Sequence, residues 1–170
     1  MIDTDELVAR IRASGAARPV VLIDGRSGAG KTTLARELAP ALGAQLVSLD
    51  DLYPGWGGLA EGTAAVHETL LRAREPGWTR WDWVSARAAE WHPVDPTRPI
   101  VIEGCGALSR ANRALATFGI WVELSAAERR RRVLEREPEF APHWREWAAQ
   151  ERAHAAREHP RSLADVIVDG

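Results

Sequence analysis

One short segment constrains the fold of this chain more than any other: Gly25-Arg26-Ser27-Gly28-Ala29-Gly30-Lys31-Thr32, which follows the pattern G-x-x-x-x-G-K-T. Its glycines remove Cβ atoms that would keep a bulky anion away from the backbone N–H groups. A loop of this kind binds phosphate when a strand precedes it and a helix follows it. The segment therefore predicts a phosphate-binding loop, provided that its flanks have those structures.

The residues on both sides of the loop meet this requirement. Residues 19–24 form an apolar run typical of a buried strand, and from Thr33 onward leucines recur at every fourth position, as in a helix. We expect Pro40 to kink the last turn of that helix and Gly43 to end it. The alternative, a glycine-rich turn without a ligand, does not explain why strand and helix flank the motif.

Each part of the loop has an expected role. Backbone N–H groups cradle the phosphates, the Lys31 ammonium reaches the β- and γ-phosphates, and the Thr32 hydroxyl is placed to bind Mg²⁺. The sequence thus predicts a nucleoside triphosphate, written here as ATP, together with Mg²⁺; it does not distinguish ATP from other triphosphates. The residues expected to hold the nucleotide are Gly25, Ser27, Gly28, Ala29, Gly30, Lys31, Thr32 and Thr33.

Composition limits the other possibilities. A chain of 170 residues fits one domain, so we expect residues 1–170 to form a single kinase-like unit. A net charge of −2 predicts no nucleic-acid partner. The lone Cys105 and the lack of a long apolar run predict a cytoplasmic protein without a membrane partner. An oligomer is neither indicated nor excluded.

Four further strands are expected, separated by helical stretches and following a first amphipathic helix at residues 3–14. This alternation predicts an α/β fold: the three-layer P-loop NTPase arrangement, a five-stranded parallel sheet with helices on both faces. Ligands of such sheets collect at the carboxyl ends of the strands. The further strands are expected at 45–49, 99–104, 118–124 and 165–168.

Acidic residues follow two of these strands and are therefore expected beside the phosphate loop. Asp50 is the candidate base for an acceptor hydroxyl, although an Asx turn or helix cap is the commoner role of such an aspartate. Asp51 is expected in a turn or in a supporting position beside the substrate, and the sequence leaves open whether Asp50 or Asp51 is the base. Glu103 follows four apolar residues, as does a carboxylate that holds Mg²⁺; its alternative role is a hydrogen bond to the phosphate loop.

An arginine-rich helix follows the fourth strand. Ser125-Ala126-Ala127-Glu128 is a capping box, and we expect the helix to run to about Glu137, before Pro138. Its arginines form either a solvated charged face or a lid that closes over the transferring phosphoryl group. Arg129 and Arg132 are the predicted catalytic members of the face that also carries Arg136.

The acceptor is expected between the second and third strands, where five of the eight tryptophans occur. Each tryptophan alone is more typical of packing than of ligand binding. No histidine spacing there or elsewhere indicates a zinc site. The residues predicted to contact the substrate are Asp51, Tyr53, Trp56, Arg80 and Asp82.

Together these segments resemble the uridine kinase/phosphoribulokinase-like branch of the P-loop small-molecule kinases. Asp50-Asp51-Leu52-Tyr53 is similar to that family's Asp-x-Phe-Tyr, Ile102-Glu103-Gly104 to its Val-Glu-Gly, 126–135 to its lid and 164–168 to the strand near its adenine site. The resemblance implies that Asp50 is the base and that Glu103 serves the metal. Residues 51–98 do not match a pyrimidine-nucleoside pocket.

The leading prediction is a P-loop small-molecule kinase that transfers the γ-phosphoryl group of ATP to a hydroxyl of a nucleoside-like, sugar-like or vitamin-precursor alcohol. Two alternatives remain: a regulatory P-loop ATPase that acts as a nucleotide switch, and a toxin-type or antibiotic-type phosphotransferase. The composition argues against a regulatory GTPase, because its Asn-Lys-x-Asp segment requires a lysine beyond Lys31, the only one in the chain.

Overall fold

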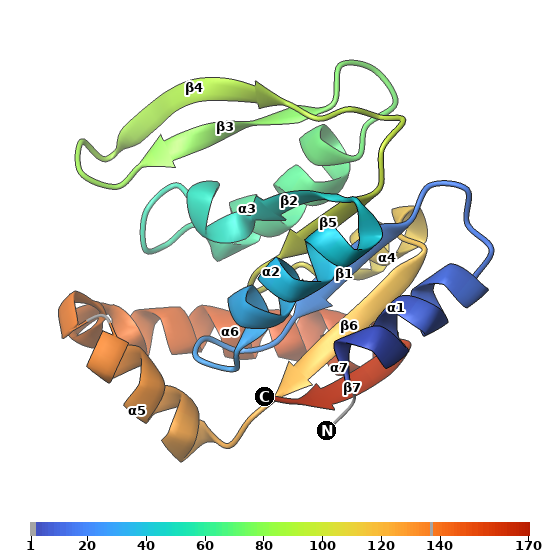
Figure 1. The fold of residues 1–170 in the computed structure, drawn as a ribbon. Coiled ribbons are helices and arrows are strands. Elements are labelled where there is room, and N and C mark those ends of the chain that lie inside the picture. Colours follow the sequence, from blue (N-terminus) through green and yellow to red (C-terminus); the bar gives the residue numbers. More distant parts are fainter. Residues whose placement is uncertain (1–2, 137) are drawn as a thin grey trace.

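A computed structural model describes residues 3–136 and 138–170. Its main sheet has five parallel strands in the order β2-β5-β1-β6-β7 (Figure 1). This confirms the predicted five-stranded parallel sheet. The strands are β1 (Val20–Asp24), β2 (Gln45–Ser48), β5 (Ile100–Glu103), β6 (Phe118–Glu123) and β7 (Val166–Asp169).

The middle of the sheet is its most apolar part. Every residue of β1 and β5 is buried, because helices cover both faces and a strand lies on each side. The edge strand β7 alternates buried and exposed residues instead. Since β1 pairs with β5 and with β6, the loop that follows it emerges at the centre of the sheet's carboxyl edge.

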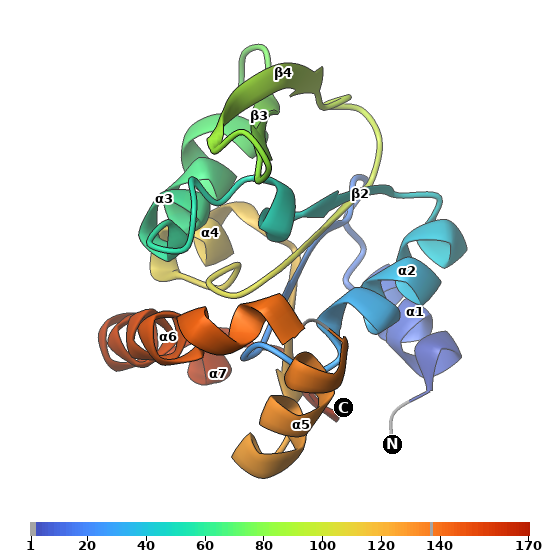
Figure 2. The same ribbon diagram turned by 90° about the vertical axis from the view of Figure 1, so that its left-hand side faces the viewer.

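Helices form a layer on each face, and each layer encloses its own apolar core (Figure 2). The helices α1 (Thr4–Ala13) and α2 (Lys31–Leu42) pack on one face against Val21, Ile23 and Val101. Alternate residues of the same strands point into the other core. The helices on that second face are α3 (Leu59–Ala65), α4 (Arg110–Leu115), α6 (Trp144–Glu158) and α7 (Pro160–Leu163).

Helix α2 begins directly at the phosphate loop. Gly30 precedes it with a φ of 103°, a left-handed conformation that favours glycine. Pro40 lies within the last turn, and Gly43 ends the helix with a φ of 62°, as its position in the sequence predicted.

The segment between β2 and β5 contains elements that the sequence analysis did not predict. After the 3₁₀ turn η1 (Leu49–Asp51) and α3, a π-helical turn η2 (Val66–Leu70) leads into an antiparallel hairpin. Its strands, β3 (Gly77–Asp82) and β4 (Arg87–Pro93), form a separate two-stranded sheet at the top of Figure 1. Four of the five tryptophans of this segment therefore lie in the hairpin: Trp78, Trp81, Trp83 and Trp91.

The predicted arginine helix is α5 (Ala126–Arg136), and Ser125 caps it as one half of the predicted capping box: the Glu128 N–H donates to the Ser125 hydroxyl over 3.3 Å, while the Glu128 carboxylate accepts from Arg131 and Arg132. The predicted end at Glu137 lies outside the described residues. A 3₁₀ turn, η3 (Pro138–His143), connects this region to α6. Across residues 3–136 and 138–170, none of the helices combines the length and apolar character needed to cross a membrane.

Candidate active site

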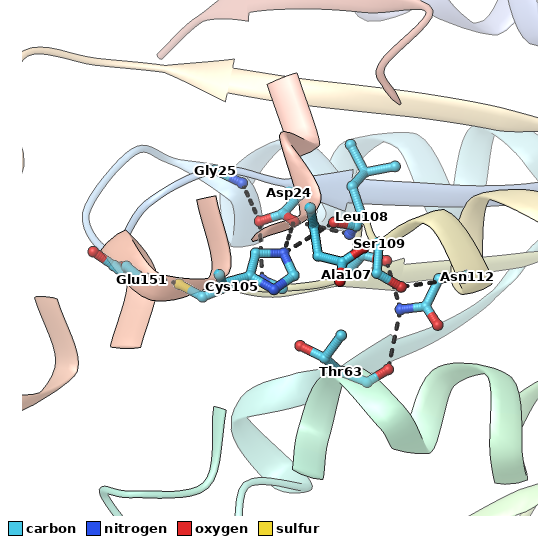
Figure 3. Close-up of polar contacts among 12 residues, drawn as sticks. Asp24, Gly25, Thr63, Cys105, Ala107, Leu108, Ser109, Asn112 and Glu151 are labelled. Atoms are coloured by element: carbon cyan, nitrogen blue, oxygen red, sulfur yellow. Dashed lines mark hydrogen bonds and ion pairs between the residues drawn. The ribbon is translucent and has the colours of Figure 1, made fainter. Parts of the chain in front are cut away.

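The phosphate loop is anchored at its start by a buried carboxylate. Asp24, at the end of β1, accepts the N–H groups of Gly25 at 2.6 Å, Gly106 at 3.0 Å and Leu108 at 2.8 Å (Figure 3). Burial raises the pKa of this carboxyl, and the nearby His154 opposes the shift. Asp24 therefore ties the loop to the segment after β5. Sequence reasoning missed this role, although an acidic residue that ends an apolar strand was a usable signal.

Lys31 points into the loop rather than into solvent. Its ammonium donates to the Arg26 carbonyl at 3.3 Å and to the Cys105 sulfur at 3.4 Å. Burial disfavours the ammonium form, but the surrounding Cys105, Glu103 and acidic side chains outweigh it, so the pKa of Lys31 lies above its ordinary value. The lysine is held as a cation where the motif requires one.

Thr32 and Glu103 meet on the other side of the lysine. The Glu103 carboxylate is 1% exposed and accepts the Thr32 hydroxyl at 3.1 Å and the Ser48 hydroxyl at 2.6 Å. These oxygen donors are the type that Mg²⁺ prefers. No cluster of three or more His, Cys, Asp or Glu side chains able to hold a metal occurs among the described residues.

The 3₁₀ turn after β2 brings two aspartates to the same edge of the sheet. Asp50 and Asp51 both line the cavity that begins at the phosphate loop. Partial burial raises the pKa of Asp51, and the positive charge of Arg80 opposes this shift. Asp50 is exposed, and its backbone carbonyl accepts the indole N–H of Trp83 at 2.9 Å.

This cavity has a volume of about 420 Å³. It extends from the phosphate loop past the two aspartates to a group of aromatic rings. Most of the predicted site residues therefore share one space. Its lining from the loop and the sheet edge comprises Ser27, Gly28, Gly30, Lys31, Thr32, Thr33, Asp50, Asp51 and Glu103; the remaining lining residues are Tyr53, Trp56, Trp83, Cys105, Val133, Arg136, Glu139, Phe140 and Trp147.

Ser27 is held from two sides by charged side chains, an arrangement we call the Ser27 clamp. The Glu151 carboxylate accepts the Ser27 N–H at 2.7 Å, and the Arg129 guanidinium donates to the Ser27 carbonyl at 3.2 Å. Each of the two side chains is only 6% exposed. Arg129 also donates to the Leu124 carbonyl at 3.1 Å, so its described contacts are with backbone rather than with the cavity. Glu151 was not among the predicted site residues.

The other predicted lid arginines have different surroundings. Arg132 is exposed and donates to Glu128 at 3.1 Å on its own helix. Arg136, one turn further on, lines the cavity. Arg131 is exposed and bridges Glu128 and Glu135.

The predicted substrate residues separate into two groups. Tyr53 and Trp56 line the cavity together with Asp51, and the Tyr53 hydroxyl donates to the Cys105 carbonyl at 2.8 Å. Arg80 and Asp82 are not among the lining residues. Arg80 pairs with Glu90 across the hairpin, and Asp82 accepts hydrogen bonds within the hairpin turn.

The parallel sheet, the loop at its carboxyl edge and the Lys31–Thr32–Glu103 group define a P-loop nucleotide-binding protein. A family model described as an AAA domain matches residues 21–146, and the chain belongs to that family. This match confirms the expected P-loop fold, and the relatives described next confirm the expected likeness to P-loop small-molecule kinases.

Individual relatives are similar over most of the chain. A shikimate kinase from Corynebacterium efficiens is 34% identical over 120 residues, which span 69% of this chain but only 65% of that protein. One from Corynebacterium diphtheriae is 29% identical and covers 91% of the chain and 95% of its own length. A solved structure described as a possible uridine kinase from Bacillus stearothermophilus superposes with a TM-score of 0.67 at 22% identity. The match covers 98% of this chain and 97% of the other, and it supports the fold.

Proposed function

We propose that this chain is an ATP-dependent kinase that transfers the γ-phosphoryl group to a hydroxyl of a small molecule. The observation that carries the proposal is the single cavity that begins at the phosphate loop and continues past Asp50 into a ring-lined space. A protein that only bound or hydrolysed a nucleotide would not need a second compartment beyond the γ-phosphate. Relatives named shikimate kinase support the same class of reaction.

The phosphate end of the cavity has the groups that bind a triphosphate. Loop N–H groups and the Lys31 ammonium would hold the phosphate oxygens. Thr32 and Glu103 would hold Mg²⁺ from the protein side, since their oxygens already converge. When bound, this ion offsets the charge of the β- and γ-phosphates.

The acceptor end supplies the base. Asp50 takes the proton of the acceptor hydroxyl as that oxygen bonds to the γ-phosphorus, and the bond between this phosphorus and the β–γ bridging oxygen breaks to release ADP. Asp51, Tyr53 and Trp56 would position the acceptor. Arg80 is proposed to act indirectly, through its charge on Asp51.

The arginines of α5 complete the proposal. Arg132 would turn from Glu128 toward the phosphates when the lid closes, and its charge would then stabilise the transition state. Arg129 would contribute by holding Ser27 and thus the loop. Asp82 is proposed to maintain the turn of the hairpin that carries Trp83.

A panel of small alcohols tests this function. The purified chain is incubated with Mg²⁺–ATP and each alcohol, ADP release is followed, and phosphorylated products are identified by mass spectrometry. We expect ADP release to rise with one chemical class of alcohol and a phosphorylated alcohol to form. Slow hydrolysis that no alcohol accelerates, but that a protein partner does, would instead indicate the nucleotide switch.

A further inference from the structure

The acceptor end of the cavity has an unusual combination of side chains, aromatic rings and carboxylates. Tyr53 and Trp147 are buried at 1% and 4% exposure, with ring centroids 4.8 Å apart. Trp83 has 39% of its surface exposed although its indole N–H is hydrogen-bonded. The full set of rings that line the cavity is Tyr53, Trp56, Trp83, Phe140 and Trp147.

Trp56 is held at the centre of these rings. It stacks on His143 with centroids 4.2 Å apart and planes 7° apart, and it contacts the rings of Trp83 and Phe140 at 5.0 Å each. The Gln150 side chain also donates to its carbonyl at 2.7 Å. We call the five rings that line the cavity the aromatic wall. These contacts hold its side chains in place, so it can bind a ligand without first ordering them.

Carboxylates line the same cavity as these rings. Asp50 and Asp51 line the cavity from η1, and Glu139 lines it from η3. The basic side chains that line it, among the described residues, are Lys31 and Arg136. Lys31 is hydrogen-bonded within the phosphate loop, and Arg136 lies on the helix proposed to close over phosphate. Rings and carboxylates together favour a cation, because the face of an aromatic ring attracts positive charge.

We propose that the acceptor is a hydroxylated amine: an amino alcohol or an aminated, hydroxylated ring whose ammonium group lies against the aromatic wall and the carboxylates. This inference rests on the proposed kinase function and narrows its substrate class. It departs from the relatives named shikimate kinase, because shikimate carries a carboxylate, and the carboxylates of this cavity would repel an anionic acceptor.

Three ring alcohols with the same cyclohexanol core and a cationic, neutral or anionic 4-substituent test the inference: trans-4-aminocyclohexanol, trans-cyclohexane-1,4-diol and trans-4-hydroxycyclohexanecarboxylate. Binding is measured by tryptophan fluorescence and calorimetry in the presence of Mg²⁺ and a non-hydrolysable ATP analogue. We expect the amine to bind at least about tenfold more tightly than the diol, and the carboxylate to bind more weakly than the diol. Equal binding of all three, absence of binding by all three, or preference for the carboxylate overturns the inference.

Two variants test whether the preference for the amine over the diol arises from the carboxylates of the cavity. Glu139→Gln removes a lining carboxylate and should reduce the preference for the amine over the diol several-fold. Glu135→Gln, on the exposed side of α5 and paired with Arg131, is the matched control and should leave that preference unchanged. If both variants change it equally, the cavity carboxylates are not its source.

The same compounds separate this inference from the function on which it rests. If the γ-phosphoryl group of ATP is transferred to neutral alcohols but not to amines, the kinase function stands and the proposal of a hydroxylated amine as acceptor is wrong. If amines bind selectively but no alcohol is phosphorylated, the kinase function is wrong and the preference of the cavity for cations stands.

Discussion

Removing one side of the Ser27 clamp should destabilise the folded chain by a measurable amount. In Glu151→Ala the Ser27 N–H loses an acceptor at 2.7 Å, and the buried Arg129 loses a neighbouring negative charge. A hydrogen bond to a charged group contributes about 1.5–3 kcal/mol. We therefore expect the free energy of unfolding to fall by about 2–3 kcal/mol. At about 2–4 °C per kcal/mol for a chain of this size, Tm should fall by roughly 4–12 °C.

A conservative variant separates hydrogen-bond geometry from charge. Glu151→Gln keeps an oxygen that can accept the Ser27 N–H and loses only the charge, so we expect it to cost about 1 kcal/mol, less than the alanine variant. Glu146→Ala, on the same helix but exposed, should stay within about 0.5 kcal/mol of wild type. Urea denaturation without nucleotide measures all three.

The clamp hypothesis is refuted by either of two results. One is a Glu151→Ala variant whose unfolding free energy lies within about 0.5 kcal/mol of wild type. The other is a glutamine variant as unstable as the alanine variant, because the retained hydrogen-bond acceptor would then contribute nothing to the free energy of unfolding. Binding of an ATP analogue to the same preparations shows whether the loop still adopts its phosphate-binding conformation.

Three further changes test other parts of the site. Lys31→Ala should lower turnover at least about 10²-fold, measured by ADP release, because no other lysine can replace its charge; near-normal turnover would contradict its role. Arg132→Ala should lower kcat far more than it weakens ATP binding in calorimetry, and an unchanged kcat would leave Arg132 as a solvated surface residue. Burial raises the pKa of the Cys105 thiol to about 12. Its alkylation by iodoacetamide at pH 8 should therefore be at least about 10²-fold slower than that of free cysteine, and should still rise between pH 9 and 10 where free cysteine levels off; a plateau near pH 9 would show an ordinary thiol.

The fold was largely predictable because its strands are short apolar runs bounded by glycine, proline or acidic residues. Residues 19–24 and 99–104 needed no tertiary information to be identified as buried strands, whereas the pairing of β1 with β5 is seen only in the structure. The oxygens of Thr32 and Glu103 meet because Glu103 ends β5 and Thr32 follows the loop after β1, the neighbouring strand.

The hairpin at β3 and β4 was missed for a physical reason. Its burial does not alternate along the strands, because neither face of this two-stranded sheet is fully covered. Tryptophan and threonine, which favour strands, were the available signal. Without knowledge of the hairpin register, Arg80 and Asp82 were both assigned to the substrate site. In the structure Arg80 pairs with Glu90 on the opposite strand.

The Ser27 clamp was beyond sequence reasoning for a different reason. Arg129 and Glu151 lie 102 and 124 residues from Ser27 and come from separate helices. Only the packing of α5 and α6 against the loop brings them to the N–H and the carbonyl of the same residue. Periodicity within either helix carries no information about that contact.

The central claim is that Asp50 is the base of a phosphoryl transfer, and Asp50→Asn tests it most directly. The change keeps the size of the side chain and removes its basicity, so single-turnover transfer to an accepted alcohol should slow about 10²–10⁴-fold while affinity for Mg²⁺–ATP stays within a few-fold. Both quantities are measured on one preparation, by rapid quench and by calorimetry. Transfer that survives within a few-fold would contradict the account, and loss of nucleotide binding would place Asp50 at the metal instead.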